Sequence, residues 1–202
     1  MRRIILTVLA AAALQAQAAP KDKEANINIH YKESAADKAL REFKEADLPL
    51  PAFPDARSGN WFDMYVNESY GKNARILLDS IQPASDGTVR YILNERSKSG
   101  HDNLTAEAMF CSGTSFDYGD RKRSSYKVYG FGDTVNRRWI APRNPVWKNT
   151  DTTLNRDKTA HGILFNAFCV DGTPKSAAAL RDRIIDRAGK NGKRLSGRKN
   201  SF

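Results

Sequence analysis

The sequence predicts an α+β fold: a single antiparallel, β-rich domain, built as a meander, a sandwich or a partly open barrel, with short flanking helices. Three observations support this class. Short apolar runs recur between residues 61 and 140, turn residues separate them, and no long helical pattern intervenes. This spacing favours antiparallel strands, because parallel neighbours need a long crossover. We assign the domain to residues 36–174.

Five segments have the apolar patterns of strands: 61–66, 75–81, 88–95, 104–111 and 125–131. Between the second and third runs, residues 83–87 end in Asp-Gly, a strong signal for a tight turn. From Val89 to Asn94 the side chains alternate, which predicts one apolar face and one mixed face. Residues 132–138 predict a further turn, leading to Trp139 and Ile140.

Three short helices are expected beside these strands. Residues 37–47 place Leu40 and Phe43 on one face, with Asp37 as a plausible N-cap. The proline-rich residues 48–54 end that helix and must run extended. Residues 154–168 and 176–188 have apolar residues at helical spacing.

The first 18 residues have the three parts of a cleaved signal peptide. Arg2 and Arg3 are basic, residues 4–14 are apolar, and Ala16-x-Ala18 supplies the small residues that a signal peptidase reads. That apolar run is shorter than the roughly 20 residues that span a bilayer, so no transmembrane segment remains after cleavage. We expect export to the periplasm by the general secretory route, rather than by the twin-arginine route suggested by Arg2-Arg3. The mature chain begins with a flexible lead-in, residues 19–35.

Cys111 and Cys169 are the two cysteines of the chain, and they lie 58 positions apart. No Cys precedes Cys111, which excludes a lipoprotein. In an oxidising compartment we expect the pair to form a disulfide, worth about 4 kcal/mol in the chain-entropy model. The alternatives are a redox pair, which more often has C-x-x-C spacing, and a zinc site, which needs further ligands. We assign no metal site and no cofactor.

Positive charge is concentrated at the C-terminal end. Of a formal net charge of +10, most belongs to residues 175–202, which hold nine Lys or Arg against two Asp. We expect a basic helix there, followed by a disordered tail from Gly189. The candidate polyanion-binding residues are Arg187, Lys190, Lys193, Arg194, Arg198 and Lys199. They predict binding to anionic lipid or another polyanion, or else a solvated tail that keeps the protein soluble.

Two basic clusters lie within the domain, close in sequence to aromatic residues. They are Arg121, Lys122 and Arg123, and Arg137, Arg138 and Trp139. Such clusters can form a polyanion or glycan surface, although ordinary charged loops have the same pattern. The expected compartment disfavours a nucleic acid, so the expected partner is an unidentified component of the cell envelope.

No catalytic constellation stands out, and we assign no catalytic residue. His101 and Asp102 are adjacent in a turn, but a Ser/His/Asp arrangement requires three groups that converge in space. Glu107 is either a general acid or base or, as we expect, an outward-facing strand residue. His161 falls on the apolar face of a predicted helix, where we expect it to be packed.

Several segments carry a resemblance to a known family. They are residues 85–91, 96–100, 103–111 and 126–132, and the closing Phe168-Cys169. In these segments the chain resembles the cryptic-neisserial-protein-like family, exported proteobacterial proteins with no assigned biochemical activity. The likeness begins near Trp61 and leaves the leader and the basic tail outside it. At residues 136–139 the chain departs from the pattern, where a Gly-containing turn is expected before Trp139.

The resemblance implies the fold and the compartment but supplies no function. Together with the composition, it favours a non-enzymatic envelope protein that acts as a binding or accessory module. An envelope hydrolase acting on glycan or peptide is the alternative, which requires titratable residues such as His101 or Glu107 to meet in a cleft. A third hypothesis places the function in the basic tail, as binding to polyanions or anionic membranes.

Overall fold

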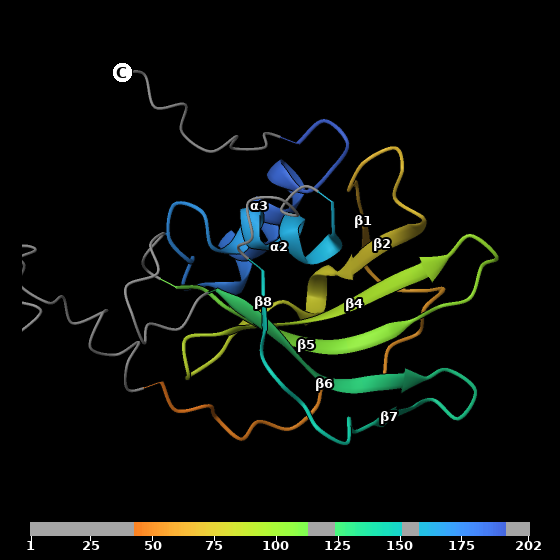
Figure 1. The fold of residues 1–202 in the computed structure, drawn as a ribbon, viewed down its shortest axis with the longest axis horizontal. Helices are drawn as coiled ribbons and strands as arrows, with labels where there is room; N and C mark the ends of the chain where they lie inside the picture. Colours follow the sequence, from red (N-terminus) through yellow and green to blue (C-terminus); the bar gives the residue numbers. More distant parts are fainter. Residues whose placement is uncertain (1–42, 113–123, 151–157, 193–202) are drawn as a thin grey trace, which may run out of the picture. The chain divides into compact units, whose positions relative to one another are not determined.

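The computed structural model of this chain describes residues 43–112, 124–150 and 158–192 (Figure 1). The predicted signal peptide and lead-in lie outside these residues. In chain order the elements are β1 (Trp61–Met64), β2 (Lys72–Leu77), a 3-10 turn (Leu78–Ser80), β3 (Gln82–Pro83), β4 (Val89–Ser97), β5 (Leu104–Phe110), β6 (Ser125–Asp133), β7 (Arg138–Ile140), β8 (Lys148–Asn149), α2 (Ala160–Phe168) and α3 (Ala177–Arg187). The α+β class predicted from the sequence is confirmed.

The eight described strands form one antiparallel sheet in the order β1-β2-β4-β5-β6-β7, with β3 beside β4 and β8 beside β6. Apart from the two-residue strands β3 and β8, strands that follow each other in the chain are neighbours in the sheet, so the meander is the correct one of the three expected arrangements. The terminal strands β1 and β7 are not paired with each other, and the sheet stays open rather than closing into a barrel.

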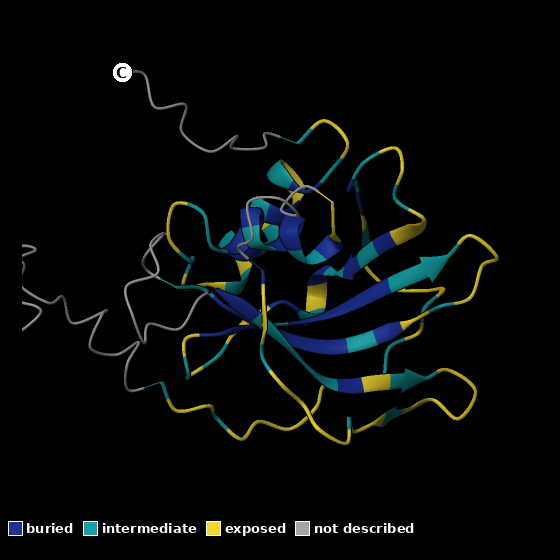
Figure 2. Cartoon of the chain, in the orientation of Figure 1, coloured by how far each residue is buried: buried dark blue, intermediate teal, exposed yellow. Residues whose placement is uncertain are grey.

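Each face of the sheet has its own cover. On β4 the side chains of Val89, Tyr91 and Leu93 belong to the main core, which both helices complete. We call this side the helix face, and Figure 2 shows that burial is concentrated on β4, on β5 and on the sides of the helices toward them. The opposite side carries Arg90 and Ile92, which alternate with these residues. The alternation predicted for this strand is therefore confirmed.

The two helices start at polar caps. The Thr159 hydroxyl accepts from the Gly162 N–H at the start of α2, and Ser176 does the same for the Ala179 N–H at the start of α3. The helix predicted for residues 176–188 is confirmed to within a residue at each end. The helix predicted for residues 154–168 ends where expected but starts at Ala160, after residues 158 and 159, and residues 154–157 lie outside the described residues. The expected disulfide is confirmed: Cys111 and Cys169 join the end of β5 to the end of α2.

Residues 43–58 precede the sheet, contain no helix or strand, and are called the arm below. The helix predicted for residues 37–47 is wrong over its described part, and residues 37–42 lie outside the description. The physical reason is a set of stronger partners elsewhere: the Ala46 N–H donates to Asp86 Oδ2 (3.0 Å), and Arg90 Nη2 donates to the Ala46 carbonyl (3.4 Å). Because Arg90 lies on the side of the sheet away from the helices, we call that side the arm face.

Candidate functional site

A hollow of about 650 Å³ opens where β1, β2 and the loop between them meet β4. Cross-strand pairing explains its wall, since Asp63 lies opposite Arg75 and Asn73 lies opposite Arg96. Tyr65, Glu68, Tyr70 and Lys72 add further polar groups. The volume is in the range of small-molecule sites, which usually measure about 300–1,000 Å³. We call this feature the β1–β2 hollow.

Charged groups around the β1–β2 hollow are paired with one another. Arg75 Nε lies 2.8 Å from Asp63 Oδ1, and the Arg75 guanidinium lies 5.6 Å from the centre of the Trp61 ring. Lys72 Nζ lies 2.9 Å from Glu95 Oε2. Opposite charges are thus balanced across the wall, which offers hydrogen-bond donors and acceptors rather than an excess of one charge.

A second polar cluster lies between the sheet and α2. Glu107 on β5 is 3% exposed, so the expectation of an outward-facing residue is wrong. Its Oε2 accepts from the Tyr91 hydroxyl (2.9 Å) and lies 2.9 Å from His161 Nε2, while its Oε1 accepts from the Thr105 hydroxyl (2.7 Å). His161 is packed as predicted, stacked on the Tyr126 ring with the two centroids 3.5 Å apart.

Ionisation in this cluster follows from burial and pairing. Burial raises the pKa of Glu107, but the His161 charge and hydrogen bonds from His161, Thr105 and Tyr91 outweigh it and leave the pKa below the ordinary value. Burial, together with the Glu107 charge, raises the pKa of Tyr91 well above its ordinary value. The Glu107 carboxylate is therefore an anion beneath α2, and its hydrogen bonds are made to neighbouring side chains of the domain.

The sequence's other titratable candidate, His101, does not join Glu107. His101 is exposed in the turn between β4 and β5, where its backbone N–H donates to the Ser97 hydroxyl (3.0 Å). Neither residue lines the β1–β2 hollow. Within residues 43–112, 124–150 and 158–192, no three His, Cys, Asp or Glu side chains gather in a way that could hold a metal ion.

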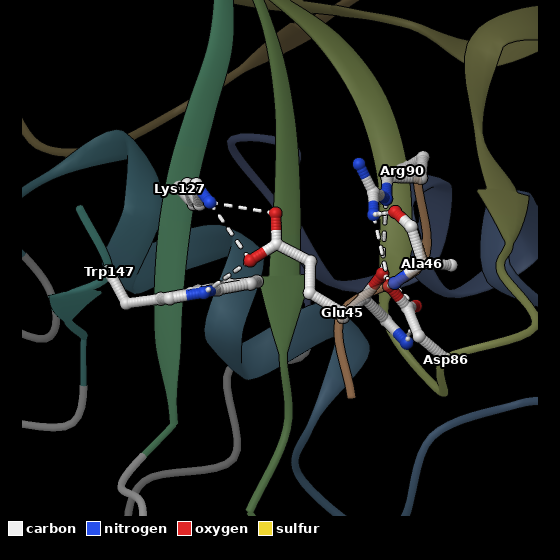
Figure 3. A network of polar contacts seen from close by, with 7 residues as sticks. Glu45, Ala46, Asp86, Arg90, Lys127 and Trp147 are labelled. Carbon is white, nitrogen blue, oxygen red and sulfur yellow. Dashed lines mark hydrogen bonds and ion pairs between the residues drawn. The ribbon is translucent and has the colours of Figure 1, made fainter. Parts of the chain in front are cut away.

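On the arm face, a polar network ties the arm to the sheet (Figure 3). Glu45 accepts from Lys127 Nζ at both carboxylate oxygens (2.7 and 2.9 Å) and from Trp147 Nε1 (3.2 Å). Beside it, Asp86 Oδ2 binds Arg90 Nη2 at 3.0 Å. Burial raises the pKa of Glu45, yet hydrogen bonds from the sheet, including that of Lys127, lower it below the ordinary value overall.

The register of β5 and β6 shifts between Ala106 and Glu107, and this irregularity leaves Tyr129 without a Cα partner on β5. Two cations lie near the Tyr129 ring: the Arg90 guanidinium is 4.1 Å and Lys127 Nζ is 5.0 Å from its centre. The arm's carboxylate therefore lies among cationic and aromatic side chains.

Of the two predicted basic clusters, Arg121, Lys122 and Arg123 lie outside the described residues. Arg137, Arg138 and Trp139 form the end of the β6–β7 hairpin. Arg138 Nε lies 3.4 Å from Asp133 Oδ2, and Trp139 Nε1 donates to the Pro51 carbonyl (2.7 Å). Arg137 has φ 52°, a conformation that favours glycine, so the backbone here suits the Gly-containing turn that the family resemblance implies. Trp139 thus contacts the arm.

The start of the predicted tail is folded. Arg187 donates to the carbonyls of Asn166 and Val170 (3.3 and 3.2 Å), and Lys190 Nζ lies 3.8 Å from Glu68 Oε1 beside the β1–β2 hollow. Residues 189–192 were expected to be disordered, but the Gly192 N–H donates to the Gly189 carbonyl (3.0 Å) in a turn. Lys193, Arg194, Arg198 and Lys199 lie outside the described residues.

Sequence reasoning missed the β1–β2 hollow and the contact between the arm and Trp139. A signal for the first was present: Asn73 and Arg75 alternate with the apolar Ala74 and Ile76, which marks a polar face on β2. The second had no local signal, because 88 positions separate Pro51 from Trp139. No helix in the described part of the chain is long and apolar enough to cross a membrane.

Comparison with known proteins gives two matches. The profile of the CNP1-like family matches residues 38–185. Cryptic neisserial protein 1 of Neisseria gonorrhoeae (strain ATCC 700825 / FA 1090) is 50% identical over 193 residues, which cover 94% of this chain and 95% of that protein. Coverage this wide reaches into the leader and the tail, beyond the extent expected from the sequence. No solved structure matches this chain.

Proposed function

The chain belongs to the CNP1-like family, and we propose that it is an exported, non-enzymatic binding module of the cell envelope. The observation that carries the proposal is the β1–β2 hollow of about 650 Å³ with its polar, charge-balanced wall. Its ligand would be a neutral molecule rich in hydroxyl groups, such as an envelope glycan.

Two features support the export step. Residues 1–18 have the composition of a cleaved leader, and the Cys111–Cys169 disulfide belongs to an oxidising compartment. Fractionation of the producing bacterium, with N-terminal sequencing of the product, tests this part. The expected result is a periplasmic protein that begins at Ala19. Recovery of the full-length chain in the cytosol with reduced cysteines would contradict it.

The glycan preference follows from the groups that face the hollow. Sugar hydroxyls both donate and accept hydrogen bonds, and so they match a wall that mixes carboxylate, amide, phenol and guanidinium groups. A strongly charged ligand would have to displace existing ion pairs, such as Arg75 with Asp63 and Lys72 with Glu95. A neutral ligand can use the remaining hydrogen-bonding capacity of the same groups without breaking those pairs.

Titration of the mature protein with a neutral oligosaccharide of N-acetylglucosamine, followed by amide chemical shifts, tests the site. We expect the shift changes to be largest at residues 63–75 and at Arg96, and Arg96→Ala to weaken binding. Arg138→Ala is the matched control, because each arginine is a strand residue whose Nε lies 3.4 Å from an aspartate. Equal weakening by the two substitutions, or shifts confined to other residues, would remove the hollow as the site.

The hydrolase alternative makes a different prediction, which is tested by incubating the mature protein with peptidoglycan. Release of reducing ends or free peptide, lost in His101→Ala or Glu107→Ala, would replace the binding proposal with an enzymatic one. Binding with unchanged ligand is the outcome that the present proposal requires.

A further inference from the structure

A strip of small residues runs under the arm on the arm face of β6. A Cβ atom added at Gly130 would lie 3.3 Å from Leu50 Cδ1, and one added at Gly132 would lie 3.3 Å from Phe53 Cε2. Leu50 and Trp139 therefore share the space over Gly130, whereas Phe53 lies over Gly132 beside Leu104, whose Cβ atom would be 2.6 Å from the added Cβ. We call this seat of the arm on β6 the groove.

The wall of this groove is Trp139. Its indole Nε1 donates to the Pro51 carbonyl (2.7 Å), and its ring packs against the Phe53 ring with the centroids 5.0 Å apart. Pro49, Pro51 and Pro54 favour an extended polyproline conformation, whose carbonyls remain available as acceptors. An indole that donates to a carbonyl beside proline, within an aromatic groove, is a known means of recognising proline-rich peptides.

At its other end the groove contacts a carboxylate and an aromatic ring of the arm. Glu45 is held by Lys127 and Trp147, as described above. Phe43 packs against Phe110 and Trp147, with centroid distances of 4.9 and 5.8 Å. The segment that fits this surface thus has an aromatic residue, a carboxylate two positions later and a proline-rich stretch after that.

Side chains, rather than a strand ladder, hold this segment in place. The described hydrogen bonds of residues 45–54 to the body each use at least one side chain, as in the pairs of Ala46 with Asp86 and Pro51 with Trp139. Leu48 and Leu50 are each 38% exposed. A similar segment can therefore take the place of the arm without breaking the pairing of any strands.

We propose that this groove binds an extended, proline-rich segment with an acidic N-terminal flank from another envelope protein, and that residues 43–54 are its built-in competitor. The arm is covalently attached, so its effective concentration at the groove is high. A partner segment binds only when its own concentration or affinity overcomes that of the arm, or when the arm is loosened. This site is separate from the β1–β2 hollow, and its test does not depend on the glycan proposal.

The test uses a fluorescein-labelled peptide of residues 43–54 and the full mature chain, with anisotropy as the readout. In the variant Leu50→Ser/Phe53→Ser the arm is loosened while the groove is intact. We expect this variant to bind the peptide at least tenfold more tightly than the wild type does. Glu45→Ala, which removes the ion pair at the other end of the arm, replaces it if the double variant does not fold, as judged by circular dichroism.

Adding Trp139→Phe to the loosened variant should weaken peptide binding about fivefold, because the ring stays and one hydrogen bond is lost. Trp61→Phe is the matched control, since Trp61 Nε1 also donates to backbone carbonyls, those of Asp55 and Ser58, beyond the end of the peptide. Equal binding by all variants, or by a scrambled peptide, would overturn the proposal. A wild-type dimer that Leu50→Ser/Phe53→Ser abolishes would also overturn it, by assigning the groove to a second copy of the chain.

Discussion

Replacing Glu107 with glutamine removes a buried negative charge and keeps the shape of the side chain. Three groups contact this carboxylate: the hydroxyls of Tyr91 and Thr105 and the ring of His161, at 2.9, 2.7 and 2.9 Å. Glutamine can still accept from Tyr91 and His161, and the Thr105 hydroxyl can rotate to accept from the new amide. The substitution therefore weakens the contacts without leaving an orphaned partner.

The expected loss of stability follows from the strength of those contacts. Hydrogen bonds to a charged group contribute about 1 kcal/mol more than neutral ones, and three of them give a loss of about 2–3 kcal/mol for Glu107→Gln. Glu107→Ala should cost about 3–5 kcal/mol, because it also leaves the buried Tyr91 hydroxyl and His161 without their acceptor. Urea unfolding at neutral pH measures both values.

The pH dependence gives an independent check with a definite sign. Because the folded-state pKa of Glu107 lies below its ordinary value of 4.5, the ionised carboxylate contributes stability above that value. This contribution is lost as the pH falls through the lower, folded-state pKa. The wild type should therefore lose more stability than Glu107→Gln as the pH falls below about 4.5.

A double-mutant cycle separates the pair from the rest of the cluster. The coupling between Glu107→Gln and His161→Ala should exceed about 1 kcal/mol, whereas the coupling with His101→Ala, in an exposed turn, should be close to zero. Parallel pH profiles for wild type and Glu107→Gln, or a loss below about 0.5 kcal/mol at neutral pH, would refute the reasoning.

Three further experiments test other parts of the chain. Cys111→Ser with Cys169→Ser should lower the free energy of unfolding in urea by about 4 kcal/mol relative to the oxidised wild type, and the reduced wild type, as control, should match the variant. Arg137→Gly should raise the melting temperature slightly, by a gain of about 0.5–1 kcal/mol, because φ is 52° there; an unchanged or lower melting temperature would contradict this. Changing the four basic residues after Gly192 to glutamine should reduce salt-sensitive binding to anionic vesicles, whereas Arg187→Gln should reduce stability and leave vesicle binding intact.

Local patterns were sufficient where a segment has one covered face. The alternation from Val89 to Asn94 predicted β4, and the apolar stripe starting at Ser176 predicted α3. The predicted outward orientation of Glu107 was wrong for the opposite reason. Its strand lies in the middle of the sheet, between β4 and β6, and the neighbouring Ala106 and Ala108 are buried on the arm face. A strand covered on both faces has no outward position for a carboxylate, and only the tertiary structure shows that cover.

The helix prediction for the arm was wrong because the same apolar spacing fits both a helix and an extended segment. In residues 37–47, Leu40 and Phe43 have helical spacing, but apolar residues at such intervals serve equally well as anchors of an extended segment. Long-range partners decided the outcome, since Glu45 pairs with Lys127, 82 positions away, and Trp147, 102 positions away. Helix-propensity and capping rules consider only residues that are close in sequence, so they do not detect such partners.

The two faces of the sheet are closed by different kinds of interaction, and this difference bears on where binding can occur. The helix face is closed by the apolar core, the Glu107–His161 pair and the Cys111–Cys169 disulfide, so uncovering it amounts to unfolding the domain. The arm face is closed by a segment held through side chains, so uncovering it leaves every strand pair intact. A ligand can therefore gain access to the arm face at a far smaller cost in free energy than to the buried carboxylate. For this reason the arm face suits the binding that we propose for it, whereas the Glu107 cluster serves stability.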